Sequence, residues 1–227
     1  MRHGAVSYFD DDGRPVPEDD VPLTQDGRAQ AEAARTLFEG VELDRVIVSG
    51  LPRTSETAAL VAPDAAIETW PALRELKGAE LSSIPPAELE EAFVHAFRGV
   101  VPNDKRFLGG ESIGELFDRV LPLVERLIGD PGWDTMLVVA HGAVNRAILS
   151  YALTGERTFL GRFEQAPGCL NVLDVDEHGE WIVRAVNVAA SDLVHRTTRL
   201  TTMEQYWSQY RTAPLSRPNR PTRCCDR

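Results

Sequence analysis

The sequence predicts an α/β fold: a three-layer sandwich with a mostly parallel central sheet, helices on both of its faces and one antiparallel strand. Two apolar, β-branched runs, residues 45–49 and 137–140, predict parallel strands, and each is followed by a glycine turn and a helical pattern. Later in the chain, residues 169–175 and 181–186 alternate like the strands of a hairpin turned at 177–180. We expect this hairpin to add the antiparallel strand at one edge of the sheet.

The first half of the chain alternates loops, helices and strands. Residues 5–23 are polar and contain three prolines, which predicts a loop. Thr24 is placed to cap a helix that ends at Gly40. The buried stripe of that helix is Ala31, Ala34, Leu37 and Phe38. The elements expected after it are the strand at 45–49, a break at Gly50-Leu51-Pro52, a helix from about Arg53 to Val61 and a short strand at 66–69.

The second half is expected to contain three helices before the hairpin. Pro85-Pro86 predict the start of the first, which carries apolar residues at every fourth position: Leu89, Phe93 and Phe97. Ser112 and Glu115 form a capping box ahead of a long second helix, and Pro122 is expected to kink it. The apolar stripe of this long helix is Leu116, Val120, Leu123 and Leu127. The third helix, at 143–153, follows the second parallel strand.

The composition is that of an ordinary globular protein. The chain has 227 residues, 43% of them hydrophobic and 26% charged, which is enough for one domain with its own core. A formal charge of −11 argues against a general nucleic-acid binder, and no apolar run reaches the roughly 18 residues of a membrane helix. Three cysteines and the lack of a secretory leader favour a reducing compartment. We therefore expect a cytoplasmic protein that binds neither nucleic acid nor membrane.

The chain divides into a folded part and a tail. Residues 1–205 carry the periodic patterns and are expected to form one domain. Residues 211–227 are rich in proline and arginine and have no apolar period. This composition predicts a disordered tail.

Five short motifs with chemically active side chains follow one another along the chain. They are Arg2-His3-Gly4, Ser49-Gly-Leu-Pro-Arg53-Thr-Ser-Glu-Thr-Ala58, Leu73-Arg74-Glu75, Gly109-Gly110-Glu111-Ser112 and Ala140-His141-Gly142. In this order they resemble the histidine phosphatase superfamily, which has the phosphoglycerate-mutase-like fold. The resemblance covers roughly residues 2–193. It implies a site for phosphoryl transfer at the carboxyl ends of the parallel strands, where open α/β sheets bind ligands.

The resemblance assigns a role to each of five residues. It implies that His3 is a nucleophile that forms a covalent phosphohistidine, that His141 assists the transfer and that Glu75 moves the protons. Arg2 and Arg53 are implied to bind the substrate, and planar guanidinium groups suit phosphate oxygens. A neutral imidazole can act as a nucleophile, and neighbouring arginines disfavour its cation. We also expect a helix amino end after each His-Gly pair to supply backbone N–H donors.

Glu75 would have to change its protonation state during the reaction. The leaving alkoxide needs a proton and the attacking water must lose one, so we expect a bell-shaped or acid-leaning pH–rate profile. Other carboxylates near it in sequence leave the choice open: Glu80, Glu88, Glu90 and Glu91. Glu111, beside the capping Ser112, is expected to be structural. His141, if protonated, would be a further donor to the transferring group.

Three features depart from the family pattern. Only Met1 precedes Arg2-His3-Gly4, where the family has an apolar central strand, so we expect either a compromised sheet or a start upstream of Met1. Phosphoglycerate mutases have a Thr or Ser and then an Asn shortly after Arg-His-Gly. Residues 5–8 carry neither at those places, and Ser7 is the candidate substitute. Residues 76–104 contain only two cations, Lys77 and Arg98. This thin basic lining favours hydrolysis over transfer to a multiply charged product.

These observations lead to one expected function and two alternatives. We expect a phosphatase that hydrolyses a small phosphorylated metabolite through a phosphohistidine at His3. No cofactor is expected, and no metal, because the histidines and cysteines show no metal-ligand spacing. The alternatives are a phosphoglycerate-mutase-type phosphotransferase and a catalytically inactive module that binds a phospholigand. Specificity is expected in segments 5–23 and 70–110, where Trp70, Phe93 and Phe97 either line the pocket or pack; the helical spacing of the phenylalanines favours packing.

Overall fold

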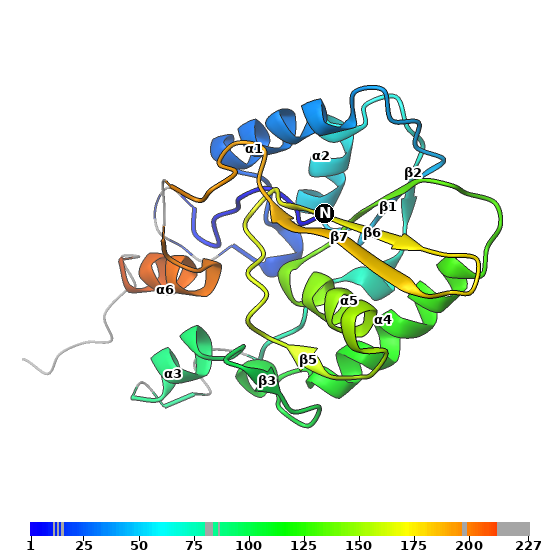
Figure 1. The fold of residues 1–227 in the computed structure, drawn as a ribbon. Helices are drawn as coiled ribbons and strands as arrows, with labels where there is room; N and C mark the ends of the chain where they lie inside the picture. The colour runs from blue at the N-terminus through cyan, green and yellow to red at the C-terminus, as the bar shows by residue number, and fades with distance from the viewer. Residues whose placement is uncertain are drawn as a thin grey trace, which may run out of the picture.

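A computed structural model describes residues 1–10, 12, 14, 16–79, 84–85, 87–196 and 199–212. Its centre is a parallel sheet in the order β2–β1–β4 (Figure 1). The three strands are β1 (Arg45–Val48), β2 (Ile67–Thr69) and β4 (Met136–Val139). Both predicted parallel strands and the short strand beside them are therefore confirmed.

Residues 1–3 extend this sheet beyond β4. Arg2 forms a parallel bridge with Ala140. The N–H groups of Ala140 and His3 donate to the carbonyls of Met1 (2.9 Å) and Ala140 (3.1 Å), and on the other side Arg2 N–H donates to Cys169 O (2.9 Å). This short segment occupies the place of the central strand, and the side chain of Met1 lies in the core. The predicted gap in the sheet is not observed at this position.

The C-terminal hairpin forms a two-stranded sheet of its own next to residues 1–3. It consists of β6 (Leu170–Val175) and β7 (Trp181–Val188), which pair antiparallel. The bonds Arg2 N–H to Cys169 O and Gly168 N–H to His3 O make the residues that lead into β6 antiparallel to the N-terminal segment. The predicted hairpin is therefore confirmed, as a separate two-stranded sheet that these two bonds link to the N-terminal segment. A separate antiparallel pair joins β3 (Val100–Val101) to β5 (Phe159–Leu160).

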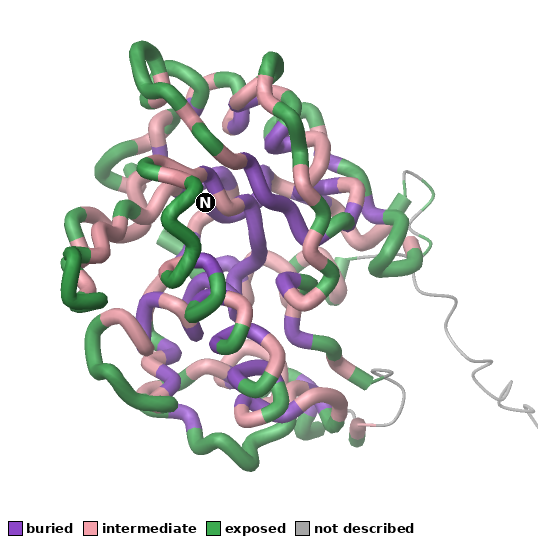
Figure 2. The backbone as a smooth tube through the Cα atoms, turned by 90° about the vertical axis from the view of Figure 1, so that its right-hand side faces the viewer, coloured by how far each residue is buried: buried purple, intermediate pink, exposed green. Residues whose placement is uncertain are grey.

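Helices cover both faces of the sheet, as predicted (Figure 1). Successive side chains of β1 point to opposite faces: Val46 and Val48 pack toward α1 and α2, whereas Ile47 packs toward α4 and α5. Figure 2 shows that the buried backbone is concentrated at the centre of the molecule, between these helical layers. The helices are α1 (Gln25–Arg35), α2 (Pro52–Val61), α4 (Ile113–Ile128) and α5 (Gly142–Thr154).

The capping residues begin the helices where the sequence predicts. The Thr24 side chain accepts a hydrogen bond from Gly27 N–H (3.1 Å) at the start of α1. Ser112 and Glu115 form the reciprocal capping box of α4, which continues through Pro122 to Ile128. Short 3₁₀ turns connect several elements: η1 (Glu18–Asp20), η2 (Thr36–Phe38), η3 (Pro71–Leu73) and η5 (Phe107–Gly109).

The helix predicted to start at Pro85-Pro86 is shorter than its periodicity suggests. α3 spans only Leu89–Val94, and Phe97 lies in the turn that follows. The Phe97 ring instead packs on Phe107 (centroids 5.5 Å apart) and Phe159 (5.7 Å). Tertiary packing of this ring therefore overrides the local helical pattern.

A further helix, α6 (Thr202–Thr212), was not predicted. Its aromatic residues make the contacts that hold it: Trp207 packs on Phe93 of α3 (6.3 Å) and Tyr206 on Tyr8 (5.2 Å). Arg211 and Thr212, the first two residues of the predicted tail, are helical, and the rest of that tail lies outside the described residues. Among the helices described, none is long and apolar enough to cross a membrane.

Candidate active site

Two His-Gly turns meet at the carboxyl end of the parallel sheet. His141 lies two residues after the end of β4, and His3 ends the segment that bridges Ala140. Both side chains are buried, with 2% and 0% of their area exposed for His3 and His141. The ring centroids are 5.1 Å apart and the planes are inclined by 63°. Two segments separated by most of the chain therefore place their imidazoles in edge-on contact.

The ring of His3 has one nitrogen fixed and one free. Its Nδ1 lies 2.7 Å from the carbonyl oxygen of Gly4. A carbonyl only accepts, so Nδ1 carries the proton and Nε2 of the neutral ring keeps its lone pair. Burial, followed by the charges of Arg2 and Arg53, holds the pKa of His3 well below 6.5. At neutral pH the ring is therefore neutral, as predicted from the adjacent arginines.

The chain after His3 does not form the helix that the sequence predicts after each His-Gly pair. Val6 instead bridges Leu23, and the first α-helix begins at residue 25. Gly4 is tightly packed here, because a Cβ on it would collide with the carbonyl of Gly27 in the first turn of α1. Gly4 N–H donates instead to Thr57 Oγ1 on α2 (3.1 Å).

His141 is held through its other nitrogen. Its Nε2 lies 2.8 Å from Ser49 Oγ, which in turn lies 3.0 Å from Thr54 Oγ1. Thr54 donates its own proton to Leu51 O (2.8 Å), so Ser49 donates to Thr54 and Nε2–H of His141 donates to Ser49. Nδ1 of His141 is buried without a partner in the described structure.

Burial, the neighbouring His3 ring and the charges of Arg53 and Arg2 hold the pKa of His141 well below 6.5. The condition under which His141 was expected to donate, a protonated ring, is therefore disfavoured by the protein itself. A phosphoryl dianion beside Nδ1 would act in the opposite direction, because an adjacent negative charge favours the cation. The helix α5 begins at Gly142, as predicted for this turn.

Arg53 reaches the site from the first turn of α2. Its side chain is fully buried; Nη1 donates to Glu18 O (2.8 Å), and Nη2 lies 3.7 Å from the Glu18 carboxylate. Nε and Nη2 form no hydrogen bond with any described residue. Because an unsatisfied buried donor is costly, these two groups are suited to an anionic ligand.

Arg2 is turned toward α6 rather than presenting its fork to the two rings. Nη1 donates to Gln165 O and to Thr202 Oγ1 (2.8 Å), and Nη2 donates to Tyr206 OH (3.0 Å). Only Nε has no partner among the described residues. A phosphate contact through both Nη atoms of Arg2 would therefore require its guanidinium group to move away from α6.

Glu75 lies against the amino end of α5. Its Oε1 accepts from Leu76 N–H (2.9 Å) and Ala143 N–H (3.1 Å), whereas Oε2 has only a long contact with Ala143 N–H (3.4 Å). The other carboxylates considered for this role lie elsewhere: Glu88, Glu90 and Glu91 are exposed at α3, and Glu80 falls outside the described residues. Glu111 pairs with Arg119 (2.6 Å), in keeping with a structural role.

A pocket of about 760 Å³ opens beside Glu75. It is lined by parts of both segments predicted to carry specificity, including 17–19 and 74–78. Four cations and five carboxylates line it, so it has no net positive charge: Arg74, Lys77, Arg106 and Arg119 against Glu18, Asp19, Glu75, Glu111 and Glu115. Trp70 is not in its lining and instead stacks on Arg126 (4.1 Å). Ser7 hydrogen-bonds Phe9 in a local turn.

The geometry brings the five predicted residues to one region and adds others that sequence reasoning missed. Ser49 orients His141, Thr57 fixes Gly4, and Arg146 of α5 lies beside Gly142. The signal for Arg146 was present, since it is the one charged residue of the sequence Gly142–Thr154. Within the described ranges, no group of three or more His, Cys, Asp or Glu side chains is arranged to hold a metal ion.

Comparisons with known proteins identify the family and the fold of the chain. The family model "Histidine phosphatase superfamily (branch 1)" matches residues 1–188. A 2-carboxy-D-arabinitol-1-phosphatase of Triticum aestivum is 28% identical over 67% of this chain, although the match spans only 32% of that protein's length. A Proteus mirabilis protein named "Probable phosphoglycerate mutase GpmB" is 29% identical over 87% of this chain and 93% of its own. The crystal structure of the α-ribazole phosphatase from Shigella flexneri superposes with a TM-score of 0.63 at 20% identity, over 82% of this chain and 94% of that one.

Proposed function

Since the chain belongs to the histidine phosphatase superfamily, we propose that it hydrolyses a small phosphomonoester through a covalent phosphohistidine at His3. The observation that carries the proposal is the pair of buried imidazoles, 5.1 Å apart, among donors without protein partners. These donors belong to Arg2 and Arg53, and a tetrahedral oxyanion is the ligand that satisfies them. The phosphatase name of the wheat relative supports the same reaction class.

In the first half-reaction, Nε2 of His3 attacks phosphorus with its lone pair while the bond to the ester oxygen breaks. The departing oxygen takes a proton from Glu75 and leaves as an alcohol. Arg53 and a protonated His141 stabilise the charge that spreads over the equatorial oxygens. The products of this step are the alcohol and a phosphohistidine.

In the second half-reaction, a water molecule attacks the phosphohistidine. Glu75, now ionised, accepts the proton of that water, and the P–N bond breaks to return its electron pair to His3. Inorganic phosphate then leaves. The same carboxyl group thus serves as acid and then as base, which is why a bell-shaped or acid-leaning pH–rate profile is expected.

The charge of the pocket favours water over a charged acceptor. A mutase has to bind and rephosphorylate a multiply charged product, which calls for surplus positive charge. Here three of the four pocket cations are paired with carboxylates: Arg74 with Asp19 (3.7 Å), Arg106 with Glu115 (3.0 Å) and Arg119 with Glu111 (2.6 Å). The named mutase relative from Proteus keeps transfer as the second candidate function.

A panel of phosphorylated metabolites and p-nitrophenyl phosphate tests the proposal. We expect wild type to release inorganic phosphate and His3→Ala to lose at least about 10³-fold of that activity. Transfer to added phosphoglycerate or alcohol in place of water would favour the mutase-type reaction. Tight binding of vanadate without turnover of any ester would instead favour an inactive module that binds a phospholigand.

A further inference from the structure

Arg146 is a buried charge beside the reaction centre for which the proposed mechanism has no role. It lies on α5, one turn after Gly142, and only 4% of its area is exposed. The residues around it in the first turns of α5 are also buried. Burying a guanidinium is costly unless it is paired, so a lone arginine in such a helix calls for a specific partner.

The visible partners of Arg146 only partly compensate its charge. Nη2 lies 3.4 Å from Glu164 Oε2, at the long end of a hydrogen bond, and the guanidinium carbon lies 5.2 Å from the centre of the Phe97 ring. Nε has no partner among the described residues. Glu164 is also shared, because its Oε1 accepts from Thr202 N–H (3.1 Å) and Thr202 Oγ1 (2.8 Å) at the start of α6.

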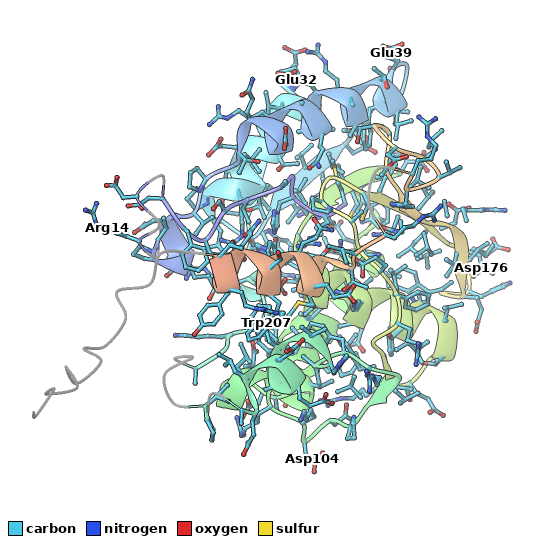
Figure 3. The ribbon with its side chains drawn as sticks, turned by 90° about the vertical axis from the view of Figure 1, so that its left-hand side faces the viewer. Arg14, Glu32, Glu39, Asp104, Asp176 and Trp207 are labelled. Atoms are coloured by element: carbon cyan, nitrogen blue, oxygen red, sulfur yellow. The ribbon has the colours of Figure 1, made fainter. Side chains whose placement is uncertain are left out.

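Figure 3 shows α6 crossing the face of the molecule, with Trp207 extending from it toward the α3 side. Glu164 is thus divided between anchoring α6 and balancing Arg146. The other terminal nitrogen of Arg146, Nη1, lies next to Gly142.

Three side chains converge on Gly142. A Cβ placed there would lie 3.1 Å from Arg146 Nη1, 3.6 Å from Glu75 Oε2 and 3.7 Å from Arg2 Cζ. Of the two Glu75 oxygens, Oε1 is fixed by two short backbone N–H contacts, so Oε2 is the oxygen with freedom to exchange a proton. Arg146 Nη1 and Glu75 Oε2 therefore both approach Gly142, although the described structure has no hydrogen bond or ion pair between them.

Electrostatics support a coupling between these groups. Burial lowers the pKa of Arg146, while the carboxylates of Glu164 and Glu75 oppose that effect. In a water-excluded site, such attraction is stronger than at the surface.

We propose that Arg146 is a positioning residue for Glu75, whose charge attracts the reactive Oε2 of that carboxyl toward Gly142. This inference rests on the proposed function, in which Glu75 protonates the leaving oxygen. Arg146 itself forms and breaks no bond. Its loss would misplace the acid, and a small misplacement of a catalytic group lowers the rate strongly.

Leaving-group dependence separates this role from a structural one. Phenyl phosphate releases a basic phenoxide that needs a proton, whereas p-nitrophenyl phosphate releases a stable anion. Because kcat/KM covers the steps up to release of the phenol, it reports the first half-reaction. We expect Arg146→Gln to lower kcat/KM for phenyl phosphate by about ten- to a hundredfold and for p-nitrophenyl phosphate by less than about threefold. Arg146→Lys, which keeps the charge, should recover most of the loss.

A double-mutant cycle with Glu75→Gln gives the second readout. If Arg146 acts through Glu75, then adding Arg146→Gln to Glu75→Gln should change kcat/KM for phenyl phosphate by less than about twofold. Arg126→Gln, which removes the arginine stacked on Trp70, is the control for loss of an arginine–aromatic contact and should leave both substrates unaffected. Should Arg146→Gln not fold, Arg146→Lys carries the test, with a smaller loss confined to phenyl phosphate.

Equal losses on both substrates, or a full loss that persists in the Glu75→Gln background, would overturn the role of Arg146 while leaving the phosphatase proposal intact. A wild-type enzyme without His3-dependent turnover of either ester would overturn both.

Discussion

The two His-Gly turns begin alike and then diverge. Each ends an extended segment of the same sheet, and together they bring two imidazole rings into contact. After His141 the chain enters α5 directly, whereas after His3 it crosses to Leu23 in extended form. The two glycines also differ in packing: a Cβ on Gly4 would meet the Gly27 backbone, whereas one on Gly142 would meet the Arg146 side chain.

The two imidazole rings are held by hydrogen bonds at opposite nitrogens. Gly4 O holds Nδ1 of His3 and leaves Nε2 free, whereas Ser49 holds Nε2 of His141 and leaves Nδ1 free. In the neutral state, Nε2 of His3 keeps its lone pair, because Nδ1 carries the proton that it donates to Gly4 O. In the neutral His141 ring, Nδ1 has no proton, and it becomes a donor when the ring is protonated. In the proposed mechanism, the same dipeptide thus supplies the nucleophile in one turn and an electrostatic partner in the other.

After the loss of His3, the loss of His141 should lower the activity most. We expect His141→Ala to lower kcat/KM by about 10²–10³-fold, the cost of one donor to the developing charge. The phosphoenzyme should still form slowly, because His3 is intact. Rapid-quench assays with p-nitrophenyl phosphate measure both quantities. A loss as complete as that in His3→Ala would make the two rings equivalent and contradict their separate roles.

The two glycines should respond differently to a methyl group. In Gly4→Ala the new Cβ would meet the Gly27 backbone, which cannot move aside easily, so we expect a loss of about 2–3 kcal/mol in unfolding free energy. In Gly142→Ala it would meet a side chain, Arg146, in a helical turn that favours alanine, and the loss should stay within about 1 kcal/mol.

Urea denaturation measures both variants. Gly142→Ala should still lose activity, because the methyl group displaces Arg146 and Glu75. Equal destabilisation by the two substitutions would mean that the turns are packed alike.

Both rings should make the folded state less stable in acid. Their pKa values lie well below 6.5 in the folded protein, while an unfolded histidine titrates near 6.5. Below that pH the unfolded chain binds protons that the folded rings do not, so stability is fully present above about pH 6.5 and falls as the pH is lowered.

Each ring can contribute a slope of up to about 1.4 kcal/mol per pH unit. Urea titrations between about pH 5 and pH 7 compare wild type with His3→Gln, His141→Gln and the double variant. Each single substitution should remove part of the slope, and the double one more than either. If the slope of the double variant equals that of wild type, the rings are not buried as neutral groups.

Ser49→Ala tests the hydrogen bond that holds His141. It removes the acceptor of His141 Nε2–H and should lower kcat/KM about tenfold, at a cost of about 1 kcal/mol in stability. Ser150→Ala is the matched control, because Ser150 is equally buried and accepts from Leu160 N–H (2.8 Å) away from the rings. The control should lose similar stability and no activity. Equal activity losses in both would assign the effect of Ser49 to folding alone.

The sequence allowed the parallel core to be predicted because its signals are local. Apolar runs and glycine turns place His141 and Arg53 at strand ends, and the capping pairs mark where α1 and α4 begin. The resemblance then singled out His3 and Glu75. The rest depends on contacts between distant segments, which no local period encodes.

Three such contacts altered the predicted picture. Residues 1–3 complete the sheet because β4 and Cys169 pair with them on both sides. Arg2 is drawn to Thr202 and Tyr206 of a helix with only a weak apolar stripe in its sequence. The ring of Phe97 leaves the helical pattern to join an aromatic cluster.

The most direct test of the account is to identify the phosphorylated atom. Wild-type enzyme is mixed with a phosphomonoester that it hydrolyses, quenched in alkali and mapped by peptide mass spectrometry, with ³¹P NMR to distinguish the two ring nitrogens. We expect phosphate on Nε2 of His3, present during turnover and missing in His3→Ala. Phosphate on His141, on Nδ1 of His3, or on neither ring during rapid turnover would contradict it.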